Sequence, residues 1–176
     1  MNMFKQLALA GAASLALATG AQATDLYTAV PSTPMYDEAG FDWEGFYFGV
    51  QKGFWFGGSN YWSFDKVAGI NFLLGDNFLV GAEAMGGIVT DFSGNLGFEA
   101  YLRGRLGLVL GGDVLIYKLG EIGYVNGTST FAFGGGLEIA VGDRMSVRGE
   151  LRGIGDIGDP GFDYAIASIG VLWHAN

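Results

Sequence analysis

The chain has 176 residues, with 9 basic and 18 acidic side chains and a formal net charge of −9. This acidic balance argues against a nucleic-acid partner. The absence of cysteine excludes disulfides, thiolate metal sites and a cysteine nucleophile. Glycine supplies 32 residues and aromatic side chains 15%, a composition that disfavours helices and that we expect of a barrel built from β-strands.

The first 23 residues have the three parts of a secretory signal. Lys5 gives the positive start, residues 7–18 form an apolar run, and Ala21-Gln22-Ala23 matches an A-x-A cleavage site. The apolar run is shorter than the roughly 20 residues that a membrane-spanning helix needs. Elsewhere glycines and charged residues interrupt every apolar stretch. The sequence therefore predicts export and disfavours a helical membrane protein.

Residues 24–42 contain Pro31 and Pro34 and little apolar periodicity, so we expect a periplasmic tail or linker. From Glu44 onward the pattern changes to alternation. We therefore expect a barrel domain over residues 43–176.

Three short glycine-containing segments mark tight turns within this domain: Gly75-Asp76-Asn77, Gly111-Gly112-Asp113 and Gly142-Asp143-Arg144. Segments rich in Gly, Ser, Thr, Asn and Asp lie between them and predict four longer loops, at 57–61, 90–95, 126–130 and 155–163. The strands predicted between these connections span 45–56, 63–74, 78–89, 96–109, 114–124, 131–141, 145–154 and 164–174. Short turns on one side and longer loops on the other are typical of outer-membrane barrels.

The predicted strands alternate strictly between apolar and polar residues, as in Leu96, Phe98 and Ala100 against Glu99 and Tyr101. A soluble periplasmic barrel of lipocalin type would turn the apolar face inward, whereas a membrane barrel turns it toward lipid. Strands longer than the usual 5–6 residues favour the membrane barrel, and aromatic residues near segment ends agree with it. The predicted fold is all-β: a closed, antiparallel, up-and-down, eight-stranded transmembrane β-barrel in the bacterial outer membrane.

Charged residues that fall on the polar face should point into the lumen. They are Glu83, Glu99, Arg103, Arg105, Lys118, Glu138, Arg148, Glu150 and Arg152. A barrel of eight strands is only wide enough for its own side chains to fill it, and unpaired charges inside would be costly. We therefore expect an ion-pair network that plugs the lumen. The alternative is a narrow porin-like path for ions or small solutes.

The segment Trp43-Glu44-Gly45-Phe46-Tyr47-Phe48-Gly49 resembles the opening strand of the outer membrane protein β-barrel domain family, which includes small barrels of the OmpA/OmpX kind and porin-like surface proteins of alphaproteobacteria. Gly136-Leu137-Glu138, the turn at Gly142 and Val147-Arg148-Gly149-Glu150-Leu151 are similar to its late strands. This resemblance implies a surface or structural role for residues 42–174.

The last predicted strand also resembles the signal read by the barrel-assembly machinery, with Ser168, Gly170, Trp173 and Ala175 at the signal positions. Family members usually end on an aromatic residue, whereas this chain ends in Trp173-His174-Ala175-Asn176. The resemblance implies that machinery as a partner during insertion, with outer-membrane lipids and lipopolysaccharide as the later surroundings.

The sequence contains few residues that point to catalysis or metal binding. A lipid A-modifying barrel enzyme would need Ser and Glu beside a lipid-facing histidine toward the outer leaflet. His174, the only histidine, is instead expected near the periplasmic end, on the lumen face. Asp156, Asp159 and Asp163 crowd one loop, but their spacing does not match an EF-hand. We therefore predict no catalytic residues, no metal site and no cofactor, and leave open an unidentified surface or envelope protein partner.

Overall fold

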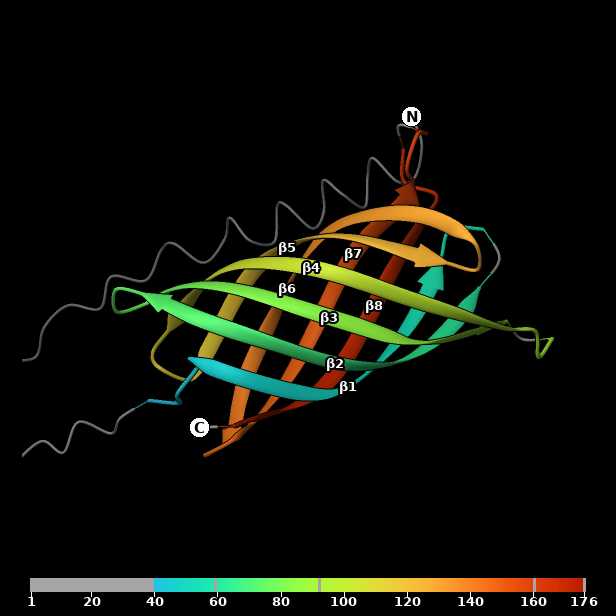
Figure 1. Ribbon diagram of the computed structural model, residues 1–176. Coiled ribbons are helices and arrows are strands. Elements are labelled where there is room, and N and C mark those ends of the chain that lie inside the picture. The colour runs from blue at the N-terminus through green and yellow to red at the C-terminus, as the bar shows by residue number, and fades with distance from the viewer. Residues whose placement is uncertain (1–39, 59, 92, 160, 176) are drawn as a thin grey trace, which may run out of the picture. The chain divides into compact units, whose positions relative to one another are not determined.

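A computed structural model of the chain describes residues 40–58, 60–91, 93–159 and 161–175. Eight strands follow one another in chain order: β1 Gly45–Phe56, β2 Tyr61–Leu74, β3 Phe78–Asp91, β4 Leu96–Leu110, β5 Val114–Val125, β6 Thr128–Gly142, β7 Met145–Asp156 and β8 Tyr164–His174. Each strand pairs antiparallel with the next, and β8 pairs with β1 to close the barrel (Figure 1). The predicted fold class is confirmed.

The predicted signal segment, residues 1–23, and most of the predicted tail, residues 24–39, lie outside the described residues. Within the described part, no helix is long and apolar enough to cross a bilayer.

The connections divide the barrel into two ends. We call the end with the short connections at residues 75–77, 111–113 and 143–144 the turn end, and the opposite one the loop end.

One prediction at the loop end was wrong. Between β5 and β6 only Asn126 and Gly127 lie outside the strands, both with positive φ (49° and 101°). Asn-Gly is the dipeptide that a two-residue hairpin turn favours. The connection is therefore a tight turn, and β6 begins at Thr128, inside the loop predicted at 126–130.

Pairing around the barrel is staggered. A path of directly paired residues runs from Gly45 through Asn71, Gly81, Arg105, Leu119, Gly134, Arg152 and Ile166 to Trp55. The path leaves β1 at Gly45 and returns to it at Trp55, ten residues further along. Such a stagger tilts strands by about 35–45° from the barrel axis. It also brings residues that are distant in sequence to the same height in the lumen.

The outer wall is apolar, as the alternation predicts for a membrane barrel. Every strand exposes large apolar side chains. Examples, one from each strand, are Phe46, Phe64, Phe78, Leu102, Ile122, Phe133, Leu151 and Ile169. Three lysines interrupt this surface: Lys52, Lys66 and Lys118 are all exposed. Lys52 lies over the ring of Trp62, with 4.4 Å from Nζ to the ring centroid.

Candidate functional site in the barrel lumen

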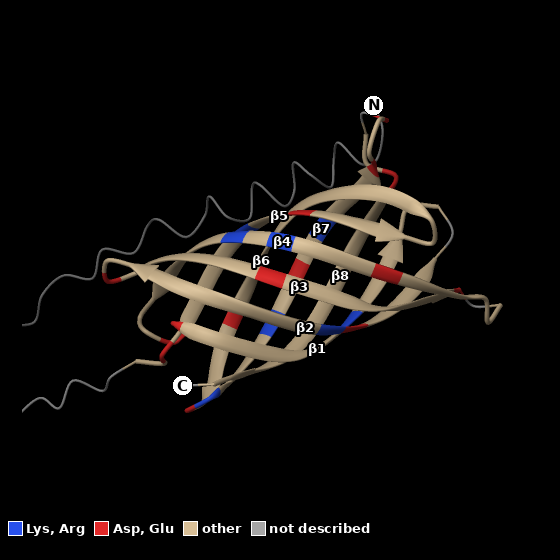
Figure 2. Cartoon of the chain, in the orientation of Figure 1, with Lys and Arg blue, Asp and Glu red and all other residues tan. Residues whose placement is uncertain are grey.

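The lumen is filled by polar and charged side chains. Four arginines and six carboxylates are buried there: Arg103, Arg105, Arg148 and Arg152 with Asp65, Glu83, Glu99, Glu121, Glu138 and Glu150. Figure 2 shows both charge signs interspersed along the strands of the barrel. Because charges out of water are costly unless they are paired, the partners of each group decide what the lumen does.

Arg103 on β4 joins three strands. Its Nη1 lies 2.9 Å from Oε1 of Glu83 on β3 and 2.8 Å from Oε1 of Glu150 on β7, and its Nε lies 2.8 Å from Oε2 of Glu121 on β5. All four side chains are fully buried. Since β4 and β7 are not neighbours in the sheet, the contact with Glu150 crosses the lumen.

Arg148 on β7 repeats this arrangement nearer the turn end. Its Nη2 lies 2.8 Å from Oε2 of Glu83, and its Nη1 lies 3.2 Å from Oε1 of Glu150. Arg105 donates from Nη1 to Glu138 at 3.1 Å and from Nη2 to the Asn71 amide oxygen at 2.9 Å. The turn-end half of the lumen is therefore one continuous network of charge-assisted hydrogen bonds.

Tyrosines complete the carboxylate shells. The Tyr47 hydroxyl donates to Glu83 at 2.8 Å, and the Tyr117 hydroxyl donates to Glu150 at 2.6 Å. The guanidinium of Arg105 lies between the two rings, 4.9 Å from the centroid of Tyr47 and 4.8 Å from that of Tyr117. The rings thus fill space and contact a cation at the same time.

The loop-end half is less completely paired. Arg152 donates from Nη1 to Glu121 at 2.5 Å, but its Nε and Nη2 have no hydrogen-bond partner among the described residues. Asp65 and Glu99 interact with each other and accept hydrogen bonds from Ser63 at 3.1 Å and Tyr101 at 3.0 Å. Within the described residues neither carboxylate forms an ion pair, and each keeps one oxygen without a donor.

The turn end is closed by residues that precede β1. Trp43 is 1% exposed, and its indole Nε1 donates to the Gly112 carbonyl at 2.7 Å. Phe41 packs against the Trp43 ring, with 4.6 Å between centroids, and against His174, at 4.7 Å. The last residues of the predicted tail therefore lie against the barrel and cover the network from this side.

Sequence reasoning placed nine charged residues in the lumen, and the structure places eight of them there. Lys118 lies on the outer wall instead. On β5 the residues of both faces are largely apolar, so alternation there gave no clear inner face. The inward positions are those of Leu115, Tyr117, Leu119 and Glu121. Glu121, which the sequence reasoning missed, is an odd number of residues from Lys118 and so faces the opposite way.

Ser146, Glu138 and His174 meet at the turn end. The Ser146 hydroxyl lies 2.5 Å from Oε1 of Glu138 and 3.1 Å from Nε2 of His174, and the same Nε2 lies 3.5 Å from Glu138. A catalytic triad divides the two imidazole nitrogens between nucleophile and acid. Here both partners face Nε2, Nδ1 has no partner within the described residues, and Ser146 is 0% exposed. The three residues form a buried polar contact without the geometry of a triad.

No family model matches the chain, and no curated protein matches it. Among solved structures, one from a study of the de novo design of transmembrane β-barrels is similar, with 14% identity, a TM-score of 0.51, and coverage of 74% of this chain and 94% of that chain. The N-terminal β-barrel domain of Pseudomonas aeruginosa OprF is also similar, with 13% identity, a TM-score of 0.50, and coverage of 72% of this chain and 96% of that one. The fold is thus that of an eight-stranded barrel of the outer-membrane type.

Proposed function

We propose that the protein is an integral outer-membrane barrel with a plugged lumen, which serves as a structural or surface component of the envelope. The observation that carries the proposal is the cross-lumen network of Arg103, Arg148, Glu83 and Glu150, whose side chains are all fully buried. Water or ions passing through would have to displace charge-assisted hydrogen bonds of 2.8–3.2 Å. The apolar outer wall supports the lipid environment.

Conductance across planar lipid bilayers tests the plugged lumen. We expect no steady single-channel steps from the purified, refolded protein, whereas a known porin in the same bilayers gives them. A double variant, Glu83→Ser with Arg103→Ser, removes two facing plug side chains without changing the net charge and serves as an opened control. Steady steps from the unmodified barrel would replace this proposal with the narrow porin-like channel.

The chain's lack of cysteine allows a direct test of location and orientation. We expect Asp159→Cys, in the connection between β7 and β8, to react with a membrane-impermeant maleimide on intact Gram-negative cells. Asp76→Cys, in a turn-end connection, should react only after the cells are lysed. Equal labelling of both before lysis, or of neither, would contradict the proposed outer-membrane topology.

Insertion by the barrel-assembly machinery belongs to the same proposal. The signal positions Ser168, Gly170 and Trp173 lie in β8, and Trp173 is exposed on the outer wall. Ala175 follows the strand and donates its backbone N–H to the Phe46 carbonyl at 2.8 Å. We propose outer-membrane lipids and lipopolysaccharide as the surroundings, with no catalytic activity.

A further inference from the structure

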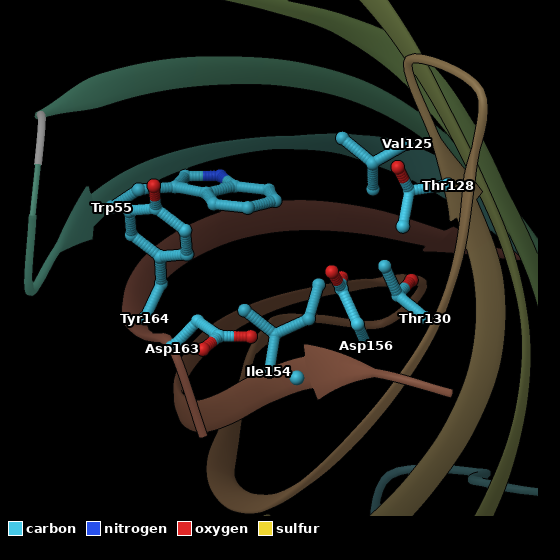
Figure 3. Close-up of a pocket in the computed structure, with 9 residues that line it drawn as sticks. Trp55, Val125, Thr128, Thr130, Ile154, Asp156, Asp163 and Tyr164 are labelled. Carbon is cyan, nitrogen blue, oxygen red and sulfur yellow. The ribbon is translucent and has the colours of Figure 1, made fainter. Parts of the chain in front are cut away.

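A cavity of about 130 Å³ opens at the loop end, above the lumen network. Its lining comes from the ends of β1, β5, β6, β7 and β8 and from the connection before β8. Figure 3 shows the Trp55 and Tyr164 rings together at one side, with Thr128, Thr130 and Asp156 opposite them. A cavity of this volume limits a ligand to a small one.

The aromatic side of the cavity is rigidly built. Trp55 contacts Tyr164 edge-to-face, with 5.8 Å between ring centroids, and Tyr61 contacts both rings at 6.3 and 6.0 Å. Trp55 is 4% exposed, so its ring is held in place by the barrel below. Ring faces fixed in this way attract cations, and Trp does so more strongly than Tyr or Phe.

The cavity lining also carries negative charge without a counter-ion among the described residues. Asp156 and Asp163 line the cavity, and no lysine, arginine or histidine does. Neither aspartate forms an ion pair among the described residues. Backbone hydrogen bonds fix the chain here: the Asp163 N–H donates to the Ile154 carbonyl at 2.8 Å, and the N–H of Ile157, which follows Asp156, donates to the Ser129 carbonyl at 2.9 Å. In Figure 3 the Asp156 carboxylate points toward the space beside Trp55.

Two buried polar groups of the lining also lack partners. Thr130 is 4% exposed, and neither its hydroxyl nor the indole Nε1 of Trp55 has a hydrogen-bond partner within the described residues. A buried polar group left unpaired costs about 1–3 kcal/mol. Both atoms are inaccessible to solvent, so the wall behind the cavity is incompletely hydrogen-bonded.

We propose that this cavity binds a small organic ammonium ion, of the size of choline or ethanolamine. The rings of Trp55 and Tyr164 provide the cation–π surface, and Asp156 and Asp163 provide the neutralising charge. The same chemistry occurs in a free ammonium compound and in a zwitterionic lipid headgroup, and the site would accept either.

Calorimetry on the refolded barrel, in a maltoside detergent that carries no cationic group, tests the proposal. Choline is compared with 3,3-dimethylbutanol, which has the same shape but no charge. We expect choline to bind at least about tenfold tighter, which corresponds to ~1.4 kcal/mol of cation recognition. Equal binding of the two, or no binding of choline, ethanolamine and short-chain phosphatidylcholine alike, would overturn the proposal.

Variants locate the site. The double variant Asp156→Asn with Asp163→Asn changes only exposed side chains and should weaken choline binding about tenfold or more. Asp159→Asn, in the same connection but outside the lining, removes one charge and should leave binding within about twofold. An equal loss in the control would mean diffuse attraction to an acidic loop and would refute a defined site.

The source of the ligand follows from two arms of the same titration. Choline alone and a short-chain phosphatidylcholine below its micelle concentration are compared, and the indole Nε1–H signal of Trp55 is followed by NMR. A shift of that signal with either ligand supports the site, and the tighter ligand identifies the source. Binding heat without any shift of the Trp55 signal would place the ligand elsewhere and reject the proposal. The result does not depend on whether the lumen conducts.

Discussion

The two ends of the lumen treat buried carboxylates differently. At the turn end, Glu138 is approached by Arg105, Ser146 and His174, and it is 0% exposed. At the loop end, Asp65 and Glu99 are nearly as buried but have only hydroxyl donors. Carboxylates that are buried to a similar degree can therefore differ in how completely they are paired. The turn end is the more completely paired half, whereas the loop end keeps more buried polar atoms without partners, below the proposed ligand cavity.

Breaking the plug should have the largest effect. Arg148→Met removes one of the two arginines that pair with both Glu83 and Glu150 and leaves buried negative charge in excess, so we expect the free energy of unfolding to fall by about 3–5 kcal/mol. Urea titration in lipid vesicles measures it. The matched control is Lys118→Met on the outer wall, which removes a charge from the lipid-facing surface and should raise stability by up to about 2–4 kcal/mol. Similar losses from both variants would contradict the assignment of inner and outer faces.

A Glu→Gln substitution at each end tests whether the two ends differ in how they stabilise buried carboxylates. Glu138→Gln removes a charge that Arg105 uses, and we expect a loss of about 1.5–3 kcal/mol. Glu99→Gln introduces an amide donor where two carboxylates face each other without one, so its stability should stay the same or rise by about 1 kcal/mol. Both follow from urea titration. A loss at position 99 as large as that at position 138 would remove the distinction between the two ends.

The cover at the turn end should contribute least. Trp43→Phe keeps most of the ring but loses the hydrogen bond from Nε1 to the Gly112 carbonyl, so we expect a loss of about 1 kcal/mol. Thermal unfolding with Trp55→Phe as the comparison measures it, because the Trp55 Nε1 has no described partner to lose. Equal destabilisation by the two variants would show that ring size alone matters.

Much of this arrangement follows from local sequence signals. The glycine-containing turns and the period-two alternation predict eight strands, and every strand except β6 begins and ends within two residues of its predicted bounds. The same alternation assigns Arg103, Arg105, Arg148 and Arg152 to the lumen. It failed for Lys118 and overlooked Glu121, because both faces of β5 are apolar around them. Asp65 was overlooked as well, although it alternates with the outward-facing Phe64 and Lys66.

The pairing between individual arginines and glutamates does not follow from the sequence. Which arginine meets which glutamate depends on the stagger that separates Gly45 from Trp55, and no local pattern encodes that number. The cavity at the loop end depends on it too, since Trp55 and Thr130 are distant in the chain and meet only through closure.

The stagger also constrains how the barrel can form. The contact of Arg103 with Glu150 and that of Gln51 with Glu150, at 2.9 Å, join strands that become close only when β8 meets β1. An open sheet therefore lacks the pairs that cross the lumen, such as Arg103 with Glu150 and Arg148 with Glu83. A slip of one residue in the last pairing would turn the inward-facing side chains of β8 to the outer wall. Closure therefore selects the correct register. The ion pairs across the lumen form in that register alone, so an incorrectly closed chain is less stable and reopens.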